Sequence, residues 1–172
     1  VVLPFENLGP PEDQYFAAGI TDEITSRLGT IPDLGVISRT SAIQYQKSNK
    51  NLKTIGDELG VDYVLEGSIR WSHSGNESKV RITPQLVRVH DDTQIWSDSY
   101  DRIINDVFQV QSDIAQSVIT QLGITLLEQQ KTTLTKAPTE NVEAYQYYLR
   151  GHELVFTATY DLGAFNETIQ YY

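Results

Sequence analysis

The stretch IGDELGVDYVLEGSIR, from Ile55 to Arg70, decides the fold of this chain. Its first part belongs to a helical pattern over Leu52–Leu59, and Gly60 suits the left-handed conformation that closes many helices. The alternation that follows predicts a strand over Val61–Trp71. One side of that strand carries Tyr63, Leu65, Gly67 and Ile69, and the other carries Val64, Glu66, Ser68 and Arg70. A turn this tight between helix and strand is typical either of a scaffold joint or of an active site.

Two more strands follow closely, over Lys79–Val89 and Ile95–Tyr100. The turn sequences HSGNE and HDDTQ separate the three strands. Connections this short join antiparallel neighbours. The sequence therefore predicts an antiparallel three-stranded meander.

The residues before and after the meander add helices and further strands to it. Apolar residues recur at helical spacing over Asp13–Leu28 and again after Asn105, which can cap a long helix. Short apolar runs predict strands at Val1–Leu3 and Leu34–Ser38, and a short helix is expected from Thr40 to Tyr45. We therefore expect an α/β domain over residues 1–130, with a mixed sheet that packs on helices.

The C-terminal part of the chain has a different pattern. Residues 131–140 predict a linker that is interrupted by Pro138. Two helical segments follow, at 141–157 and 163–172, and predict a helical hairpin. Because the chain has no Met and starts and stops within apolar patterns, we interpret it as a fragment of a longer protein.

The composition excludes several classes of function. The 172 residues carry a net charge of −10, from 13 basic and 23 acidic side chains, which disfavours direct binding to nucleic acid or to an anionic membrane. The absence of Cys excludes disulfides and thiol chemistry. No apolar run approaches the roughly 20 residues of a membrane span, so we expect no membrane contact by this chain.

The motifs that accompany catalysis are missing. HELVF, which starts at His152, lacks the second His of a zinc-protease helix, and the turn at His90 resembles an ordinary solvated turn. There is neither a phosphate-binding glycine loop with Lys nor a G-x-S-x-G elbow. We therefore predict that this chain is not an enzyme and that it holds no cofactor and no metal.

Glu66 is the strongest candidate for a special role, because a carboxylate within an apolar strand is costly to bury alone. Arg81 and Arg70 are available as partners across the hairpin. We predict a buried polar pair between Glu66 and Arg81. Exposure of Glu66 to solvent and a catalytic role are the alternatives.

Seven blocks of sequence, in this order, carry a family resemblance: VLPFENL at 2–8, YFAAGITDEI at 15–24, VISRTSA at 36–42, IGDELGVDYVLEGSIR at 55–70, RITPQLV at 81–87, QIWSDSYDR at 94–102 and DVFQVQSDIA at 106–115. Together they resemble the TolB-like amino-terminal domain, which is close to the FlgO-like domain, of bacterial multidomain regulators. In such domains the block at 55–70 joins a helix to the central strand and is not a catalytic signature. Pro84 stands where the family more often has a small residue, so we expect an edge or a bulge there.

Such domains typically precede tetratricopeptide repeats, as in adenylate-cyclase-related and CadC-like regulators. Tyr147, Gly151, Thr168 and Tyr172 fall roughly where a repeat places its aromatic, glycine, small and aromatic residues. The resemblance implies a soluble part of a bacterial, membrane-anchored protein, with the periplasmic side favoured over the cytoplasm. A class III adenylate cyclase domain or a DNA-binding domain would lie elsewhere in the parent protein.

We expect a non-catalytic sensor or protein-interaction module of a larger signalling protein. A repeat array would bind a protein partner, and its first helices would give weak homodimers. The expected interaction surface comprises Tyr145, Tyr148, Leu149, Phe156, Phe165 and Tyr172. The alternative is a small-molecule-binding domain with a cleft between sheet and helices, which a pocket with inward-facing polar groups would favour.

Overall fold

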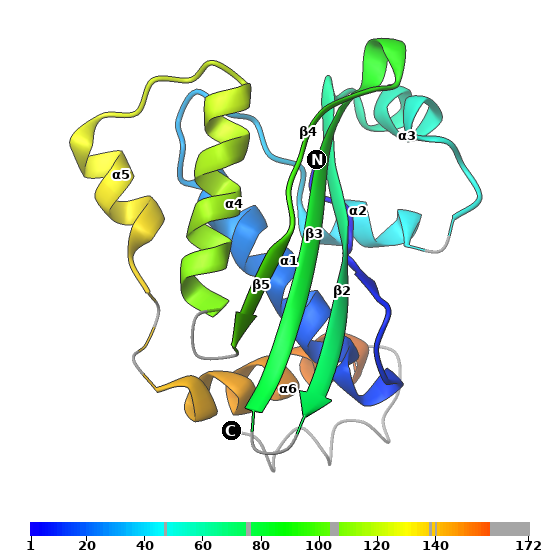
Figure 1. Ribbon diagram of the computed structural model, residues 1–172. Coiled ribbons are helices and arrows are strands. Elements are labelled where there is room, and N and C mark those ends of the chain that lie inside the picture. The colour runs from blue at the N-terminus through cyan, green and yellow to red at the C-terminus, as the bar shows by residue number, and fades with distance from the viewer. Residues whose placement is uncertain (47, 75–76, 104–106, 138, 140, 159–172) are drawn as a thin grey trace.

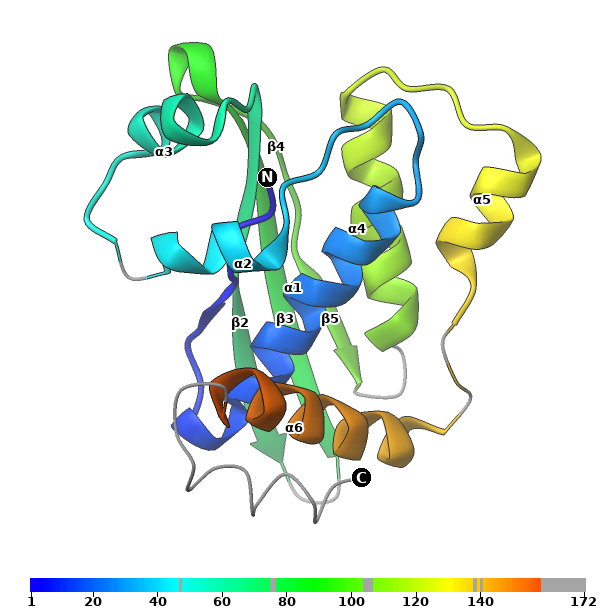
Figure 2. The same cartoon turned by 180° about the vertical axis from the view of Figure 1, so that it is seen from behind.

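The structure, a computed structural model, describes residues 1–172 except 47, 75–76, 104–106, 138, 140 and 159–172. The helices are α1 (Gln14–Gly29), α2 (Arg39–Ala42), α3 (Leu52–Leu59), α4 (Val107–Gln121), α5 (Glu128–Thr135) and α6 (Val142–Ala158). The strands are β1 (Glu6–Asn7), β2 (Tyr63–Ser74), β3 (Glu77–Arg88), β4 (Thr93–Ser97) and β5 (Tyr100–Ile103). Figures 1 and 2 show α4 and α5 on one side of the sheet, α3 on the other, and α6 across one end.

The sheet confirms the predicted α/β class and the antiparallel meander. Strand β2 pairs in parallel with β1 and antiparallel with β3, which pairs in turn with β4 and β5. The register sets Leu65 opposite Leu86 and Ile69 opposite Ile82. These cross-strand pairs form the apolar face of the sheet.

The main core lies between that apolar face and the helices α1 and α4. Leu65, Ile69, Ile82 and Ile114 are each at most 2% exposed and belong to one cluster. Phe16, Ile20 and Ile24, which recur at four-residue spacing along α1, are completely buried in it. The predicted helix faces are therefore confirmed.

The stretch from Ile55 to Arg70 forms the joint between α3 and β2. Gly60 has φ of 65°, and the Val61 amide donates to the carbonyl of Gly56 at 3.0 Å. Helix α3 packs against the sheet face opposite the main core, where Ile55 and Val64 are buried in a second cluster. At Gly67, a Cβ would lie 2.7 Å from the Thr83 carbonyl oxygen and 2.8 Å from the Phe5 ring, so the strand needs glycine there.

Pro84 occupies a gap on the outer side of β3. Strand β4 pairs with β3 from Gln85 onward, and β5 pairs with β3 only up to Ile82. Pro84 therefore faces the gap between β4 and β5. Proline has no backbone N–H to donate, but at this gap no sheet hydrogen bond is lost. Strand β3 is an inner strand and its register shift lies between Leu86 and Val87, so Pro84 occupies a local gap in the pairing and neither an edge strand nor a bulge.

Two predicted segments differ from the structure. No strand forms over Leu34–Ser38, because the half-buried Leu34 and Val36 pack against the core directly, without a backbone ladder. At the N-terminus, where a strand is expected over Val1–Leu3, Val2 makes only an isolated bridge to Leu65. The first strand, β1, begins later, at Glu6.

Part of the expected linker is helical. Helix α5 includes residues 131–135, and Leu134 is only 1% exposed. Arg27 of α1 is buried and donates hydrogen bonds to the carbonyls of Leu134 and Lys136 and to the Ser112 hydroxyl. These bonds hold the segment against α1 and α4. The domain boundaries remain predictions, and the second helix of the expected hairpin, 163–172, lies outside the described residues.

Candidate functional site

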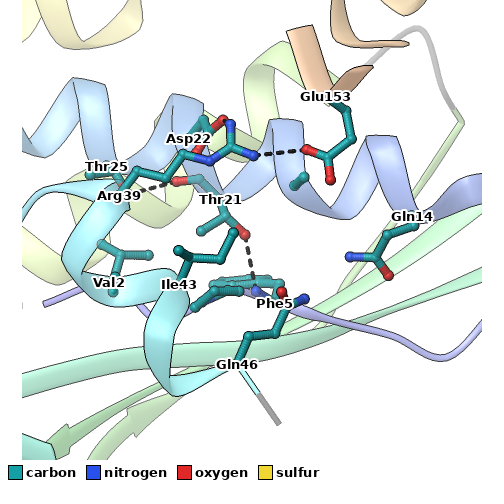
Figure 3. A pocket seen from close by; sticks show the side chains of 13 residues that line it. Val2, Phe5, Gln14, Thr21, Asp22, Thr25, Arg39, Ile43, Gln46 and Glu153 are labelled. Atoms are coloured by element: carbon teal, nitrogen blue, oxygen red, sulfur yellow. Dashed lines mark hydrogen bonds and ion pairs between the residues drawn. The ribbon is translucent and has the colours of Figure 1, made fainter. Parts of the chain in front are cut away.

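A cluster of charged side chains joins α1 and α2 to α6, which lies far from both in the sequence (Figure 3). Arg39, the first residue of α2, forms an ion pair with Asp22 of α1, and its second amino group lies 2.8 Å from Glu153 Oε2 of α6. His152 Nδ1 lies 3.3 Å from Arg39 Nη1 and 3.6 Å from Asp22 Oδ2. The hydroxyl of Ser38 caps α2 by accepting from the Ser41 amide, which positions Arg39 at the helix start.

The cluster is largely withdrawn from water. The Arg39, Asp22 and Glu153 side chains are only 18–21% exposed. Burial raises the pKa of Asp22 to about 6, although Arg39 opposes that change. Burial, together with Arg39, lowers the pKa of His152. We call this meeting of α1, α2 and α6, formed by Asp22, Arg39, His152 and Glu153, the junction. It therefore holds groups whose charge depends on pH in the mildly acidic range.

Apolar contacts hold α6 beside this cluster. Leu149 packs on Gly19 of α1, where a Cβ would approach the leucine Cδ atoms to 2.5 Å. Tyr145 is buried, and its hydroxyl accepts a 3.0 Å hydrogen bond from Gln111 of α4. The Tyr145 ring makes an edge contact with Phe108, with 4.6 Å between ring centroids. Helix α6 is thus tied to both α1 and α4, and burial raises the pKa of the Tyr145 phenol.

The expected interaction surface divides into two kinds of residue. Tyr145 and Leu149 are buried against the α/β domain, whereas Tyr148 is half exposed. Phe156 belongs to α6, but its side chain is outside the described part, as are Phe165 and Tyr172 altogether. Sequence periodicity marks these residues as apolar and aromatic but does not reveal which of them the domain itself covers.

The predicted pair of Glu66 with Arg81 is wrong. The register sets Gln85 opposite Glu66, and the Gln85 amide donates to the Glu66 carboxylate, which is half-buried. Arg81 is exposed and makes a two-pronged contact with Asp101 of β5, at 2.7 and 2.9 Å. The sequence could not show that β5 pairs with the other edge of β3 and sets the Asp101 carboxylate directly opposite Arg81.

The residues of the junction were not foreseen as a group. Asp22 reads as part of a solvated helix face, and His152 appears only in an incomplete zinc motif. The contact with Arg39 depends on where α6 docks, for which the sequence carries no local signal. Across the described residues, no three His, Cys, Asp or Glu side chains gather as a metal site would require.

The junction borders a cavity of about 20 Å³, enough for about one water molecule, between α1, α2 and the segment around Phe5 (Figure 3). A larger cleft of about 420 Å³ lies where β2 begins, and Leu34, Val36, Tyr63, Leu122 and Ile124 are among its lining residues. Among the described helices, none combines the length and apolarity of a membrane-crossing segment.

No family model matches the chain. The chain is 32% identical over 155 residues to a protein of Rhizobium meliloti (strain 1021) named "Putative adenylate cyclase 3". That match covers 90% of this chain but only 26% of the relative. The expected similarity to adenylate-cyclase-related proteins is therefore confirmed, whereas the FlgO-like and tetratricopeptide assignments remain predictions.

Among solved structures, the chain is similar to lipoprotein GNA1162 from Neisseria meningitidis, with 16% identity, a TM-score of 0.49, and coverage of 71% of this chain and 95% of that chain. A PelC dodecamer from Paraburkholderia phytofirmans gives 16% identity and a TM-score of 0.48, over 72% of this chain and 86% of that chain. TolB from Acinetobacter baumannii gives 14% identity and a TM-score of 0.46, over 70% of this chain and 27% of that chain.

Proposed function

We propose that this chain is a non-catalytic module of a larger bacterial signalling protein, and that it relays conformational change to the following segments through α6. The observation that carries this proposal is the docking of α6 on α1 and α2 by the Arg39 cluster and Leu149. A helix held in this way can report a shift of α1 relative to α2.

The similarity to an adenylate-cyclase-related protein supports a modular arrangement. The aligned stretch is 26% of the relative, which leaves room for a separate catalytic domain. We infer that any cyclase chemistry of the parent lies outside this chain. Turnover of ATP by the purified chain, with loss of that turnover in Glu66→Gln, would contradict the non-catalytic assignment.

Hydrogen exchange tests the relay through the docking of α6. In Arg39→Gln, Asp22 and Glu153 lose their shared cation, so we expect the amides of residues 145–151 to lose protection by roughly 5- to 30-fold. Arg88→Gln is the matched control, because Arg88 pairs with Asp91 on an exposed turn. Unchanged protection of α6 in Arg39→Gln would refute the relay, whatever the behaviour of the core.

We further infer that α6 opens a repeat array that binds a protein partner and that it mediates weak homodimerisation. Tyr148 and Val155 are half exposed and lie seven residues apart, on one side of the helix. Sedimentation should show a lower average mass for Tyr148→Ser than for Leu127→Ser, a control change at an exposed site on another segment. Equal monomer masses for the wild type and both variants would contradict self-association. A periplasmic location remains a prediction.

A second candidate function is the binding of an apolar small molecule in the cleft at the start of β2. The volume of about 420 Å³ and the predominantly apolar lining favour this candidate. A fluorescent apolar dye should bind to the wild type with one-to-one stoichiometry. It should not bind to the Leu122→Trp variant, in which the larger side chain fills the cleft. Equal dye binding by the variant would exclude this cleft as the site.

A further inference from the structure

A polar groove of about 780 Å³ crosses the sheet face that points away from the main core. Two cross-strand pairs form its floor, Glu66 with Gln85 and Ser68 with Thr83. Its walls come from the segment 3–14 on one side and from Tyr45, Gln46 and Ser48 on the other. The volume lies within the range of small-molecule sites.

Several side chains in this groove have unused hydrogen-bonding capacity. Within the described part of the chain, the side chains of Gln14, Gln46, Ser68 and Thr83 make no hydrogen bond to protein. The Ser48 hydroxyl oxygen is buried and likewise has no partner there. Buried polar groups are normally satisfied, so a buried hydroxyl without a partner in a groove wall indicates a ligand or water position.

The other polar groups of the groove are already engaged. Glu66 accepts from Gln85, and the Tyr45 hydroxyl donates to Glu58. The Asn7 side chain is bonded within its own loop, to Gly9 and Pro10. The capacity that remains is therefore carried mainly by neutral hydroxyls and amides, which both donate and accept.

Charge narrows the choice of ligand. Among the lining residues that the structure describes there is no Lys, Arg or His, so these residues offer no cation to a phosphate or another anion. Arg70 and Arg81, the next pair along the sheet, are not among the lining residues, and Arg81 is held by Asp101. Of the two lining carboxylates, Glu66 is engaged and Glu6 is exposed, which gives a free cation no enclosed counter-charge.

We propose that this groove binds a neutral saccharide of about two or three units. Sugar hydroxyls donate and accept hydrogen bonds, as do Ser68, Thr83 and Ser48, and the glutamine amides can bond to pairs of adjacent hydroxyls. Pro4, Gln14 and Gln46 line both this groove and the cavity beside Arg39 (Figure 3). A bound saccharide therefore adjoins the α6 junction, although its binding does not depend on the relay.

Calorimetric titration of the full chain with cellotriose, maltotriose and chitotriose tests the proposal. We expect saturable binding of at least one of the three, weakened roughly tenfold in Thr83→Val and in Ser68→Ala, because each change removes a hydroxyl. Valine suits a strand, so Thr83→Val should fold. Thr93→Val, a strand threonine outside the groove, is the matched control and should bind as the wild type does.

Several outcomes would overturn the saccharide site. These are no saturation by any of the three sugars at about 10 mM, affinity unchanged by both groove variants, or tighter binding of spermidine than of any sugar. Tighter binding of trigalacturonic acid would also overturn it, since that result would move recognition to Arg70. The Arg39→Gln variant should keep its saccharide affinity, so a failure of the relay and a failure of this site are distinguishable.

Discussion

Two joints in this molecule share one feature, the close packing of a branched apolar side chain on a helix glycine, but they lie in different chemical surroundings. Beside the α3–β2 joint, Val89, the residue that follows β3, packs on Gly56 so closely that a Cβ added at Gly56 would lie 2.4 Å from a valine methyl. At the α1–α6 joint, Leu149 packs on Gly19 with a corresponding distance of 2.5 Å. The first joint is embedded in an apolar cluster, whereas the second lies beside the charges around Arg39.

The difference separates a scaffold from an adjustable contact. The side chains that pack the α3–β2 joint are uncharged, so we expect this joint to depend less on pH than the α6 joint does. The α6 joint depends partly on half-buried charges, whose balance shifts with pH and with small movements. Valine is also stiff about χ1, whereas the ends of a leucine can rotate aside. We therefore expect the first joint to fail only with the fold and the second to loosen by itself.

The largest expected effect is in the core on which both joints rest. Ile114 is fully buried in α4, so Ile114→Ala should lower the free energy of unfolding by about 2–5 kcal/mol through lost burial and a residual cavity. Denaturant titration measures the change, with Leu127→Ala, at a residue 69% exposed, as the control. Wild-type stability of Ile114→Ala would show that the assigned core is wrong.

The next effect concerns the apolar joint. Gly56→Ala forces a methyl group against Val89. We expect this overpacking to lower the free energy of unfolding by about 1–3 kcal/mol. This exceeds the up to about 1 kcal/mol that alanine gains over glycine in a helix. Thermal unfolding should shift as one cooperative transition. A stabilised Gly56→Ala variant would mean that Val89 can move aside, which removes the contrast between the joints.

Gly19→Ala tests the other half of the comparison. Because the atoms in the way are the mobile ends of Leu149, global stability should change by less than about 1 kcal/mol. The amides of α6 should nevertheless exchange faster, while those of β2 and β3 keep their protection. Equal loss of protection in α6 and in the central strands would show that the two joints unfold together.

The smallest effect is the pH dependence of the charged junction. The pKa of Asp22 is about 6 in the folded chain against a reference of 3.8, so the contribution of Asp22 to stability is present below pH 3.8 and is lost as the pH rises through 6. His152, with its lowered pKa, contributes in the opposite direction, losing its contribution as the pH falls below its usual value of 6.5. Arg39, Glu153 and Glu23 also act on Asp22.

The advantage of the wild type over Asp22→Asn should therefore grow between pH 7 and pH 4.5, by at most about 1 kcal/mol after solvent screening. Denaturant titrations at several pH values measure this difference, with Asp57→Asn, in an exposed pair with Lys53, as the control. A difference that shrinks on acidification would reverse the assigned direction of the Asp22 pKa.

The sequence determined those features that depend on short-range patterns. Two-residue alternation placed Leu65 and Ile69 toward the core, and Gly60 closed α3 because only a residue tolerant of positive φ suits that position. Short turns imposed the antiparallel meander. The same local logic failed for Leu34–Ser38, because an apolar extended segment can pack on a core without pairing with a strand.

Only the tertiary structure decided which polar groups meet. Glu66 and Arg81 lie on neighbouring strands, but register assigned Gln85 to the first, and β5 supplied Asp101 to the second. The meeting of Asp22, Arg39 and Glu153 joins residues up to 131 positions apart in the chain. Such contacts follow from the docking of whole helices, which many weak apolar contacts determine together, and no local pattern of residues encodes their sum.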